Sequence, residues 1–247
     1  MRVCLLSSEH GSCGGIGVSL ARLSRVLARE HEVTVVHGYE AGFHGERPGD
    51  PPGLRHVVAD PTPLSDVSFA SLDHLRSAAA LQAIEQAYGD SPPDYLEVGD
   101  YRGHGLVPLQ ARNSHHRSLR GTRVGVRLHG MTELISVHDG DWANPAQRMV
   151  GDLEREGLRL ADHVLWPGGD VLGLYRRCLD PSLVEAATRV RVPFDPPGRL
   201  PEPPPSEGPL RILYAGRFQR VKGVMGLLEA CLGLESDEWR LTMIGGD

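Results

Sequence analysis

The sequence predicts an α/β protein, with a Rossmann-like doubly wound parallel sheet followed by the start of a second Rossmann-like domain. Three observations predict it. Short apolar runs rich in β-branched residues alternate with segments of helical periodicity. A glycine-rich turn at residues 11–17 joins the first apolar run to the first helical segment. Residues 196–209 hold seven prolines in fourteen positions, and a new run, glycine turn and helical segment follow them.

The first elements follow from hydrophobic spacing. The apolar run 2–7 predicts a strand, and Ile16, Leu20, Leu23 and Leu27 recur at the spacing of a helix that ends near Arg29. Residues 32–36 are rich in β-branched side chains and predict the next strand. Further strands are expected at residues 54–58, 95–98, 123–128, 163–166 and 189–192.

The remaining helices of this part are expected at residues 69–88, 106–111, 145–161 and 171–179. Asn144 followed by Pro145 favours a helix start, because Asn caps a helix and Pro is tolerated in its first turn. The segment 38–53 is rich in Gly and Pro and predicts a loop.

The proline-rich stretch divides the chain into an N-terminal domain at 1–195, a linker at 196–209 and a last part at 210–247. The last part predicts a strand at 210–215, a helix at 224–234 and a strand at 239–244. A parallel sheet is covered on both faces, so two strands and one helix make an incomplete domain. We therefore expect the second domain to be incomplete in this chain.

The composition and charge of the chain exclude several classes of function. The net charge of −6 excludes a generally basic nucleic-acid binder. No apolar run approaches the roughly 20 residues that cross a bilayer, and the first residues do not resemble a signal peptide. The four cysteines show no spacing typical of disulfides or zinc sites. The sequence thus predicts a cytoplasmic protein with no transmembrane segment and no nucleic-acid partner.

Two glycine turns are candidate phosphate sites. Gly15 and Gly17 open the first helix, whose free N–H groups attract anions, although a tight turn that binds nothing has the same pattern. The second turn places Arg217 after a strand and Lys222 before a helix. Lys222 is the only lysine among 26 Lys and Arg residues, which favours a specific role over an ordinary exposed loop lysine.

Polar residues also follow two strands of the N-terminal domain. His129 comes directly after the strand at 123–128, and Glu97 and Asp100 end the strand at 95–98. The carboxyl ends of parallel strands border the ligand crevice of an open sheet. Each of these residues taken alone is equally compatible with a structural role.

No metal site is expected. Asp139 and Asp141 flank Gly140 in a polar segment that favours a solvated turn, and the adjacent His115 and His116 lack a third ligand. The sequence contains no G-x-S-x-G, Walker A or H-E-x-x-H motif.

Together, the order of these features resembles the retaining glycosyltransferases of the GT-B fold, of the family 4 type. The segments that carry the resemblance are 15–36 (GIGVSLARLSRVLAREHEVTVV), 161–167 (ADHVLWP) and 212–228 (ILYAGRFQRVKGVMGLL). The later Glu-x7-Glu element of the family has no counterpart up to Asp247, and 192–195 (VPFD) replaces the usual Asn-Gly-x-Asp. Because the resemblance implies that the missing acids contact the donor, we expect the chain to be a truncated, inactive fragment of a longer enzyme.

The resemblance implies a hexosyltransferase-type enzyme whose N-terminal domain binds the acceptor and whose second domain binds a nucleotide-diphosphate sugar. It implies that Arg217, Lys222 and the Gly15 N–H bind the donor diphosphate and that His129 lies near the donor sugar as the catalytic residue. Glu97 and Asp100 are the candidate substrate-binding residues. Two cations can replace a metal at the diphosphate, so no cofactor is expected. The acceptor is a small molecule, a glycan or a lipid-linked molecule.

Two other functions stay open from the sequence. A GT-B sugar-nucleotide epimerase or a phosphorylase has the same crevice but uses other catalytic groups. A non-catalytic nucleotide-sugar-binding module has the binding residues without the reaction.

Overall fold

The computed structural model describes residues 1–7, 9, 14–38, 49–140, 144–194, 198, 208–234 and 239–246. The chain divides into two compact units, the first made of Met1–Leu134 and Ala143–Phe194 and the second of Ile135–Trp142 and Asp195–Asp247.

The first unit is built on a parallel sheet of seven strands in the order β3-β2-β1-β4-β5-β6-β7. The strands are β1 (Arg2–Ser7), β2 (Glu32–Gly38), β3 (Leu54–Ala59), β4 (Tyr95–Gly99), β5 (Arg123–Arg127), β6 (His163–Trp166) and β7 (Thr188–Arg189). The order runs outward from β1 in one direction and from β4 in the other, so the sheet is doubly wound. The predicted Rossmann-like fold is confirmed.

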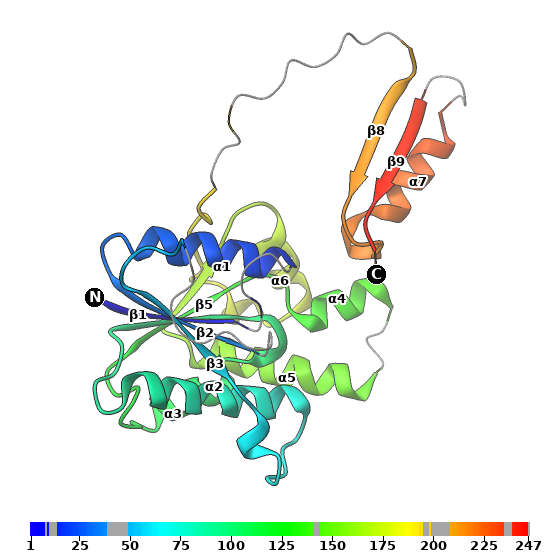
Figure 1. Cartoon of the computed structure of the whole chain (residues 1–247). Coiled ribbons are helices and arrows are strands. Elements are labelled where there is room, and N and C mark those ends of the chain that lie inside the picture. Colours follow the sequence, from blue (N-terminus) through cyan, green and yellow to red (C-terminus); the bar gives the residue numbers. More distant parts are fainter. Residues whose placement is uncertain are drawn as a thin grey trace. The chain divides into compact units, whose positions relative to one another are not determined.

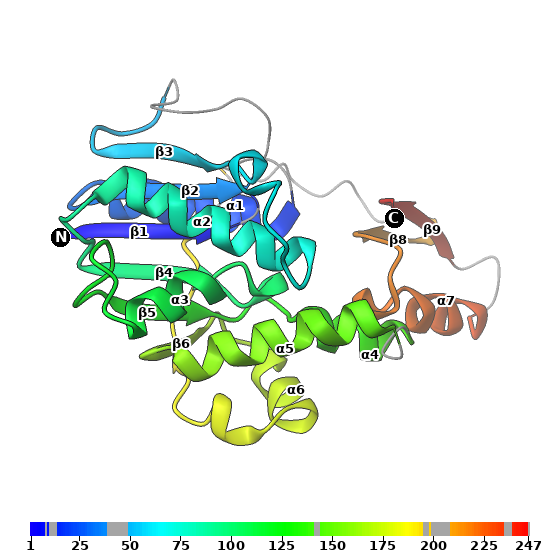
Figure 2. The same ribbon diagram turned by 90° about the horizontal axis from the view of Figure 1, so that it is seen from below.

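Helices cover both faces of this sheet. They are α1 (Gly14–Leu27), α2 (Leu72–Tyr88), α3 (Leu106–Asn113), α5 (Pro145–Leu160) and α6 (Val171–Cys178), with short 3-10 turns η1 (Thr62–Leu64), η2 (Tyr101–Gly103) and η3 (Pro181–Leu183). A further helix, α4 (Thr132–Asp139), begins in this unit, and its residues from Ile135 belong to the second. Helix α1 lies on one face, whereas α2, α3 and α5 lie on the other (Figures 1 and 2). The predicted start of α5 is confirmed, since the Asn144 side chain accepts a hydrogen bond from Ala146 N at 3.0 Å.

Strand β1 shows how the two faces are buried. Val3 and Leu5 belong to a buried cluster with which Leu20 and Leu23 of α1 pack, whereas Cys4 and Leu6 belong to a larger cluster with residues of α2, α3 and α5. Alternate residues of one strand therefore serve two cores, as strand geometry requires. This explains why the strand is a continuous apolar run rather than an alternating one.

Two expectations about secondary structure are wrong. Helix α4 is absent from the helices expected above, and the strand expected at 189–192 overlaps the two-residue strand β7 only at Arg189. The α4 error has a tertiary cause, because Glu154 of α5 accepts hydrogen bonds from the first two N–H groups of α4, Thr132 N at 2.8 Å and Glu133 N at 3.3 Å. Most of the predicted loop 38–53 and of the linker 196–209 lies outside the described residues.

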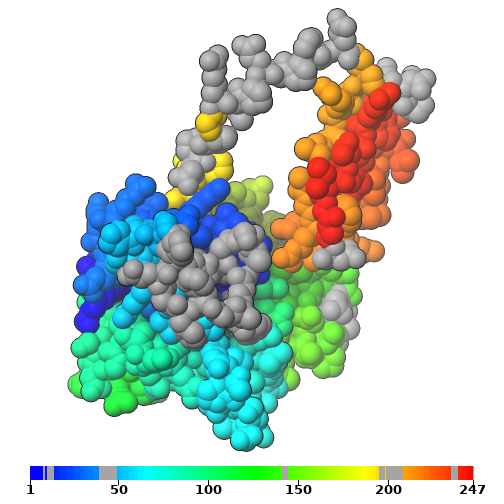
Figure 3. Space-filling model, viewed as in Figure 1, coloured from blue at the N-terminus to red at the C-terminus, as the bar shows by residue number. Residues whose placement is uncertain are grey.

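The second unit contains the predicted strand, helix and strand. They are β8 (Leu210–Ala215), α7 (Val224–Leu232) and β9 (Trp239–Ile244), with a 3-10 turn η4 (Arg220–Lys222) before α7. The strands pair in parallel, and one face of the pair is open: Leu213 is 63% exposed and Ile244 is 59% exposed. Figure 3 shows both strands at the surface, in orange and red. The domain boundaries inferred from the sequence stay predictions.

None of the helices in the described parts of the chain combines the length and the apolar composition that a membrane span requires.

Candidate functional site

A hollow lies at the carboxyl ends of β1, β4 and β5, at the point where the winding of the sheet reverses. Helix α1 contributes Ile16 and Ser19 to its lining, and the strand ends contribute Ser7 and Gly99. His129, Glu97 and Arg127 also line it. The structure thus brings together His129 and Glu97, two of the predicted site residues, at the edge where open α/β sheets bind ligands.

His129 is held by its backbone and packed by its ring. Its N–H donates to Asp100 Oδ1 at 2.9 Å. Its imidazole lies against Gly99 so closely that a Cβ added there would be 3.3 Å from His129 Cδ2. Burial, and secondarily the charge of Arg127, lowers the His129 pKa to about 4. At neutral pH the ring is therefore uncharged, and it can form hydrogen bonds without carrying a cation to the site.

Asp100 is buried behind this loop rather than in the lining of the hollow. Tyr175 of α6 donates its hydroxyl hydrogen to Asp100 Oδ2, and the same hydroxyl oxygen accepts from Gly130 N at 2.9 Å and Met131 N at 3.1 Å. Burial raises the Asp100 pKa to about 6, although these hydrogen bonds oppose the rise. Asp100 and Tyr175 thus hold the backbone that carries His129, while substrate contact by Asp100 stays a prediction.

Glu97 is part of a buried ion pair. Arg127 donates from Nε to Oε1 at 2.6 Å and from Nη2 to Oε2 at 3.1 Å, and its third nitrogen donates to Val190 O at 3.0 Å. The bidentate pair neutralises both charges at the ends of adjacent strands. Both oxygens of Glu97 accept from Arg127, so Glu97 orients the Arg127 side chain. Contact of Glu97 with a substrate stays a prediction.

At the first glycine turn, Gly14 adopts φ +69°, a conformation that favours glycine. The Glu9 carboxylate lies directly against Gly14, where an added Cβ would collide with it. Gly15 faces open space and Gly17 is buried. An anionic group therefore already lies beside the positive end of α1.

In the second unit, the loop between β8 and α7 exposes cations. Arg217, Arg220 and Lys222 are exposed, and within the described part of the chain none of them forms an ion pair. Gly223 at φ +75° joins them to α7, whose first turn lacks a capping side chain. Arg217 and Lys222 thus lie in one loop, and Arg220, which the sequence reasoning did not single out, adds a third charge.

Backbone hydrogen bonds to the end of β9 set the shape of this loop. Gly216 N donates to Ile244 O at 3.0 Å, and Phe218 N donates to Gly246 O at 3.2 Å. A Cβ at Gly245 would overlap the carbonyl oxygen of Gly216. The sequence reasoning missed Gly245, whose only signal was a Gly-Gly pair at the end of a strand.

Metal ligation has no support in the described parts of the chain, where no group of three or more His, Cys, Asp or Glu side chains could hold an ion. His116 instead contacts Glu85, with 3.1 Å between Nε2 and Oε1. Asp141 lies outside the described residues.

A doubly wound parallel sheet with polar residues at its carboxyl edge is the ligand-binding arrangement of Rossmann-like domains. Residues 13–214 match Glycosyltransferase Family 4, so the chain belongs to that family. No curated protein matches the chain by sequence.

Solved structures share the fold. The catalytic domain of starch synthase IV from Arabidopsis thaliana, bound to ADP and acarbose, matches with a TM-score of 0.65 and 12% identity over 99% of this chain and 68% of that chain. Phytolacca americana UGT2, complexed with UDP-2fluoro-glucose and pterostilbene, matches with a TM-score of 0.54 and 11% identity over 99% of this chain and 72% of that chain. TcCGT1 in complex with UDP matches with a TM-score of 0.53 and 14% identity over 87% of this chain, which spans 57% of that chain.

Proposed function

We propose that this protein transfers a sugar from a nucleotide-diphosphate sugar to an acceptor hydroxyl, with retention of anomeric configuration. Family membership and the nucleotide-bound neighbours support sugar transfer. The observation that carries the proposal is the loop between β8 and α7, where Arg217 and Lys222 precede an uncapped helix N-terminus. The chain spans 57% to 72% of the three structures above, so the proposal concerns the activity of the whole protein.

The donor diphosphate is the group that these residues suit. During transfer, the bond between the anomeric carbon and the diphosphate oxygen breaks, and its electron pair leaves with the diphosphate. Cations and N–H groups already directed at the developing charge lower the barrier, because they need not reorganise. Arg217, Lys222 and the first N–H groups of α7 supply such groups. The Gly15 N–H is the proposed contribution of the first unit.

The acceptor oxygen then bonds to the same face of the anomeric carbon, and its proton passes to the departing phosphate oxygen. Neutral His129 is proposed to hydrogen-bond a hydroxyl of the donor sugar, with its backbone held by Asp100. A divalent metal is not part of this proposal, since the side-chain cations balance the diphosphate charge. The cytoplasmic location inferred from the sequence stays a prediction.

Binding of the donor tests the proposal. Calorimetric titration with UDP-glucose and ADP-glucose should show about 10- to 100-fold weaker binding in Lys222→Gln and in Arg217→Gln, because a hydrogen bond to a charged group contributes about 1.5–3 kcal/mol. Arg211→Gln is the matched control, since Arg211 is an exposed arginine on the open face of β8. Equal losses in the control and the two variants would contradict the assignment.

Product analysis tests the reaction. Incubation of the full-length protein with donor and a panel of glycan, small-molecule and lipid-linked acceptors should yield a glycoside whose anomeric configuration, read by NMR, matches the donor. An epimerised donor without transfer would point to an epimerase. Sugar phosphate formed from a glycan would indicate a phosphorylase, and binding without any product would indicate a binding module.

A further inference from the structure

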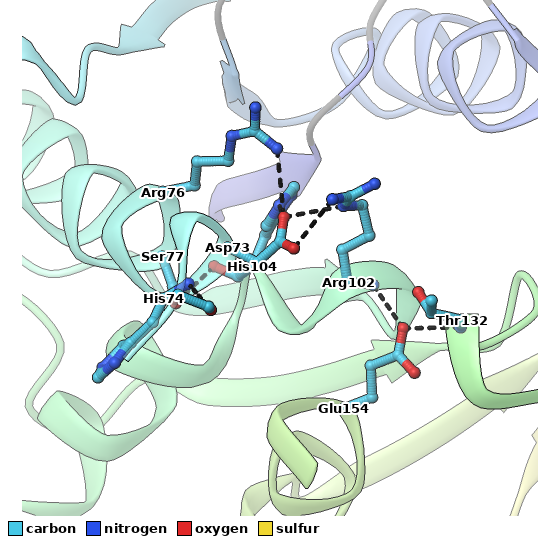
Figure 4. A network of polar contacts seen from close by, with 9 residues as sticks. Asp73, His74, Arg76, Ser77, Arg102, His104, Thr132 and Glu154 are labelled. Carbon is cyan, nitrogen blue, oxygen red and sulfur yellow. Dashed lines mark hydrogen bonds and ion pairs between the residues drawn. The ribbon is translucent and has the colours of Figure 1, made fainter. Parts of the chain in front are cut away.

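The Glu154 carboxylate of α5 is held by backbone N–H groups. The residue is 1% exposed, and within the described part of the chain it forms no ion pair. Its Oε1 accepts hydrogen bonds from Arg102 N at 2.6 Å and from Thr132 N at 2.8 Å. Figure 4 shows the carboxylate between these two residues. One oxygen therefore joins two segments that are far apart in the chain.

These two segments belong to the loops that carry candidate residues of the site. Arg102 lies in the loop after β4, which begins with Asp100. Thr132 ends the loop after β5, which contains His129. Asp100 Oδ1 accepts from His129 N at 2.9 Å, so the two loops are joined at a second place, at the strand ends. Two separate attachments fix the orientation of one loop relative to the other, whereas a single hydrogen bond would leave it free to turn.

The loop after β4 is shaped to reach Glu154. Arg102 adopts φ +62°, which an L-residue rarely adopts, and its N–H meets the carboxylate in this conformation. Its side chain donates from Nε and Nη2 to Asp73 of α2 at 2.8 and 2.9 Å, as Figure 4 also shows. Gly103 lies so close to α5 that an added Cβ would be 2.6 Å from Leu153 Cβ. An unfavourable backbone conformation is thus held from two helices, and such conformations cluster at functional sites.

A helix cap alone does not account for this arrangement. Glu154 does supply acceptors to the start of α4, at Thr132 N and, through Oε2, at Glu133 N, 3.3 Å away. The shortest of its three hydrogen bonds, however, goes to Arg102 N, which lies outside α4. Burying a carboxylate without an ion pair is unfavourable, and burial raises the Glu154 pKa to about 7. A Ser, Thr, Asp or Asn directly before α4 would cap it without this cost.

We propose that Glu154 is a positioning residue for the transfer reaction: it fixes the loop after β5 against the loop after β4 and so holds His129 at the hollow. The inference rests on the proposed function for its catalytic consequence, whereas the link between the loops does not depend on a donor. A group that is correctly oriented lowers the barrier of the reaction. Loss of the link should therefore lower kcat more than it changes the KM for the donor.

Three variants of the full-length protein separate positioning from stability. Glu154→Met removes both oxygens and keeps the approximate size, so kcat with UDP-glucose should fall about 10- to 100-fold while its KM changes less than about threefold. Glu154→Gln keeps one oxygen that can accept from both Arg102 N and Thr132 N, and it should retain most of the kcat. Thr122→Val is the matched control, because it removes a buried hydrogen bond, 2.8 Å to Pro93 O, directly before β5 at the opposite edge of the sheet. Its kcat should stay unchanged.

Hydrogen–deuterium exchange measures the link without donor or acceptor. In Glu154→Met, the peptides that contain Arg102 and Thr132 should both exchange faster than in wild type, and in Thr122→Val neither should. Should Glu154→Met not fold, as judged by thermal unfolding, Glu154→Asp keeps the charge on a side chain that is one methylene shorter. This variant should accelerate exchange in both peptides and lower kcat several-fold.

The outcomes distinguish this inference from the proposed function. Faster exchange at Thr132 with Arg102 unchanged would overturn it, because Glu154 would then serve only as a cap of α4. An unchanged kcat in folded Glu154→Met, or an equal loss in Thr122→Val, would overturn the positioning role while sugar transfer stands. If the wild-type protein transfers no sugar, the proposed function fails and the catalytic consequence with it, and faster exchange in both peptides would still establish the link between the loops.

Discussion

The hydroxyl of Tyr175 makes three hydrogen bonds that hold the loop carrying His129, and our main prediction concerns its removal by Tyr175→Phe. The hydroxyl donates to Asp100 and accepts from Gly130 N and Met131 N. The substitution removes one oxygen and keeps the ring, which is fully buried. Two backbone N–H groups and one carboxylate then lose a partner in a dry environment.

The expected cost follows from these three hydrogen bonds. A buried polar group that loses its partner costs about 1–3 kcal/mol, and relaxation of the loop recovers part of the sum. We expect the free energy of unfolding to fall by about 3 kcal/mol. Tyr95→Phe is a matched control, because the Tyr95 hydroxyl makes one long hydrogen bond, 3.4 Å, to Glu97, and its loss should cost less than about 1 kcal/mol.

Urea unfolding followed by circular dichroism measures both values. In the transfer assay, Tyr175→Phe should also lower kcat more than it changes the KM for the donor, because the loop that carries His129 loses its support while the loop proposed to bind the diphosphate is untouched. If the two variants lose the same stability, the hydroxyl does not hold this loop and the reasoning fails.

Three further predictions concern other parts of the molecule. Burial raises the Glu154 pKa from 4.5 to about 7, so the folded state holds a proton that the unfolded state releases between these pH values, and stability falls as pH rises through this window. Between pH 4.5 and pH 8, the free energy of unfolding of Glu154→Gln should fall by roughly 2–3 kcal/mol less than that of wild type, as measured by urea titrations at both pH values. The comparison with wild type is needed because the pKa of His129, lowered to about 4, makes stability rise with pH in both proteins. Gly245→Ala should destabilise the second unit by about 1–3 kcal/mol, read from Trp239 fluorescence, whereas Gly246→Ala, which faces open space, should not; equal effects would contradict the close approach. Chelation with EDTA should leave UDP-glucose binding unchanged, and a loss that added Mg²⁺ restores would show that a metal contributes.

Local patterns predicted most of the elements, because burial on a sheet leaves a periodic trace in the sequence. The strand at 163–166 and both strands of the second unit have the predicted bounds. Helix α4 left no such trace, because its start depends on Glu154, which is distant in the chain.

Some residues of the candidate site could be proposed from the sequence, and others could not. Gly15, Arg217 and Lys222 could be proposed from the sequence, because the chemistry of a glycine turn before a helix is local, and their role stays a prediction. The partners of Glu97 and Asp100 could not be predicted, since Arg127 and Tyr175 come from other strands and helices, and the structure shows both acids engaged by them. The ion pair between Asp73 and Arg102, 2.8 Å long, was not predicted for the same reason, since the two residues are 29 positions apart.

By itself, the sequence determined the class of fold, most of its elements and the two turns proposed to bind phosphate, because each depends on residues close together in the chain. The tertiary structure alone decided which charges are neutralised and which histidine is held neutral. Those properties depend on burial and on partners from distant strands and helices, and the free energy of a charge is set by its surroundings rather than by its neighbours in sequence.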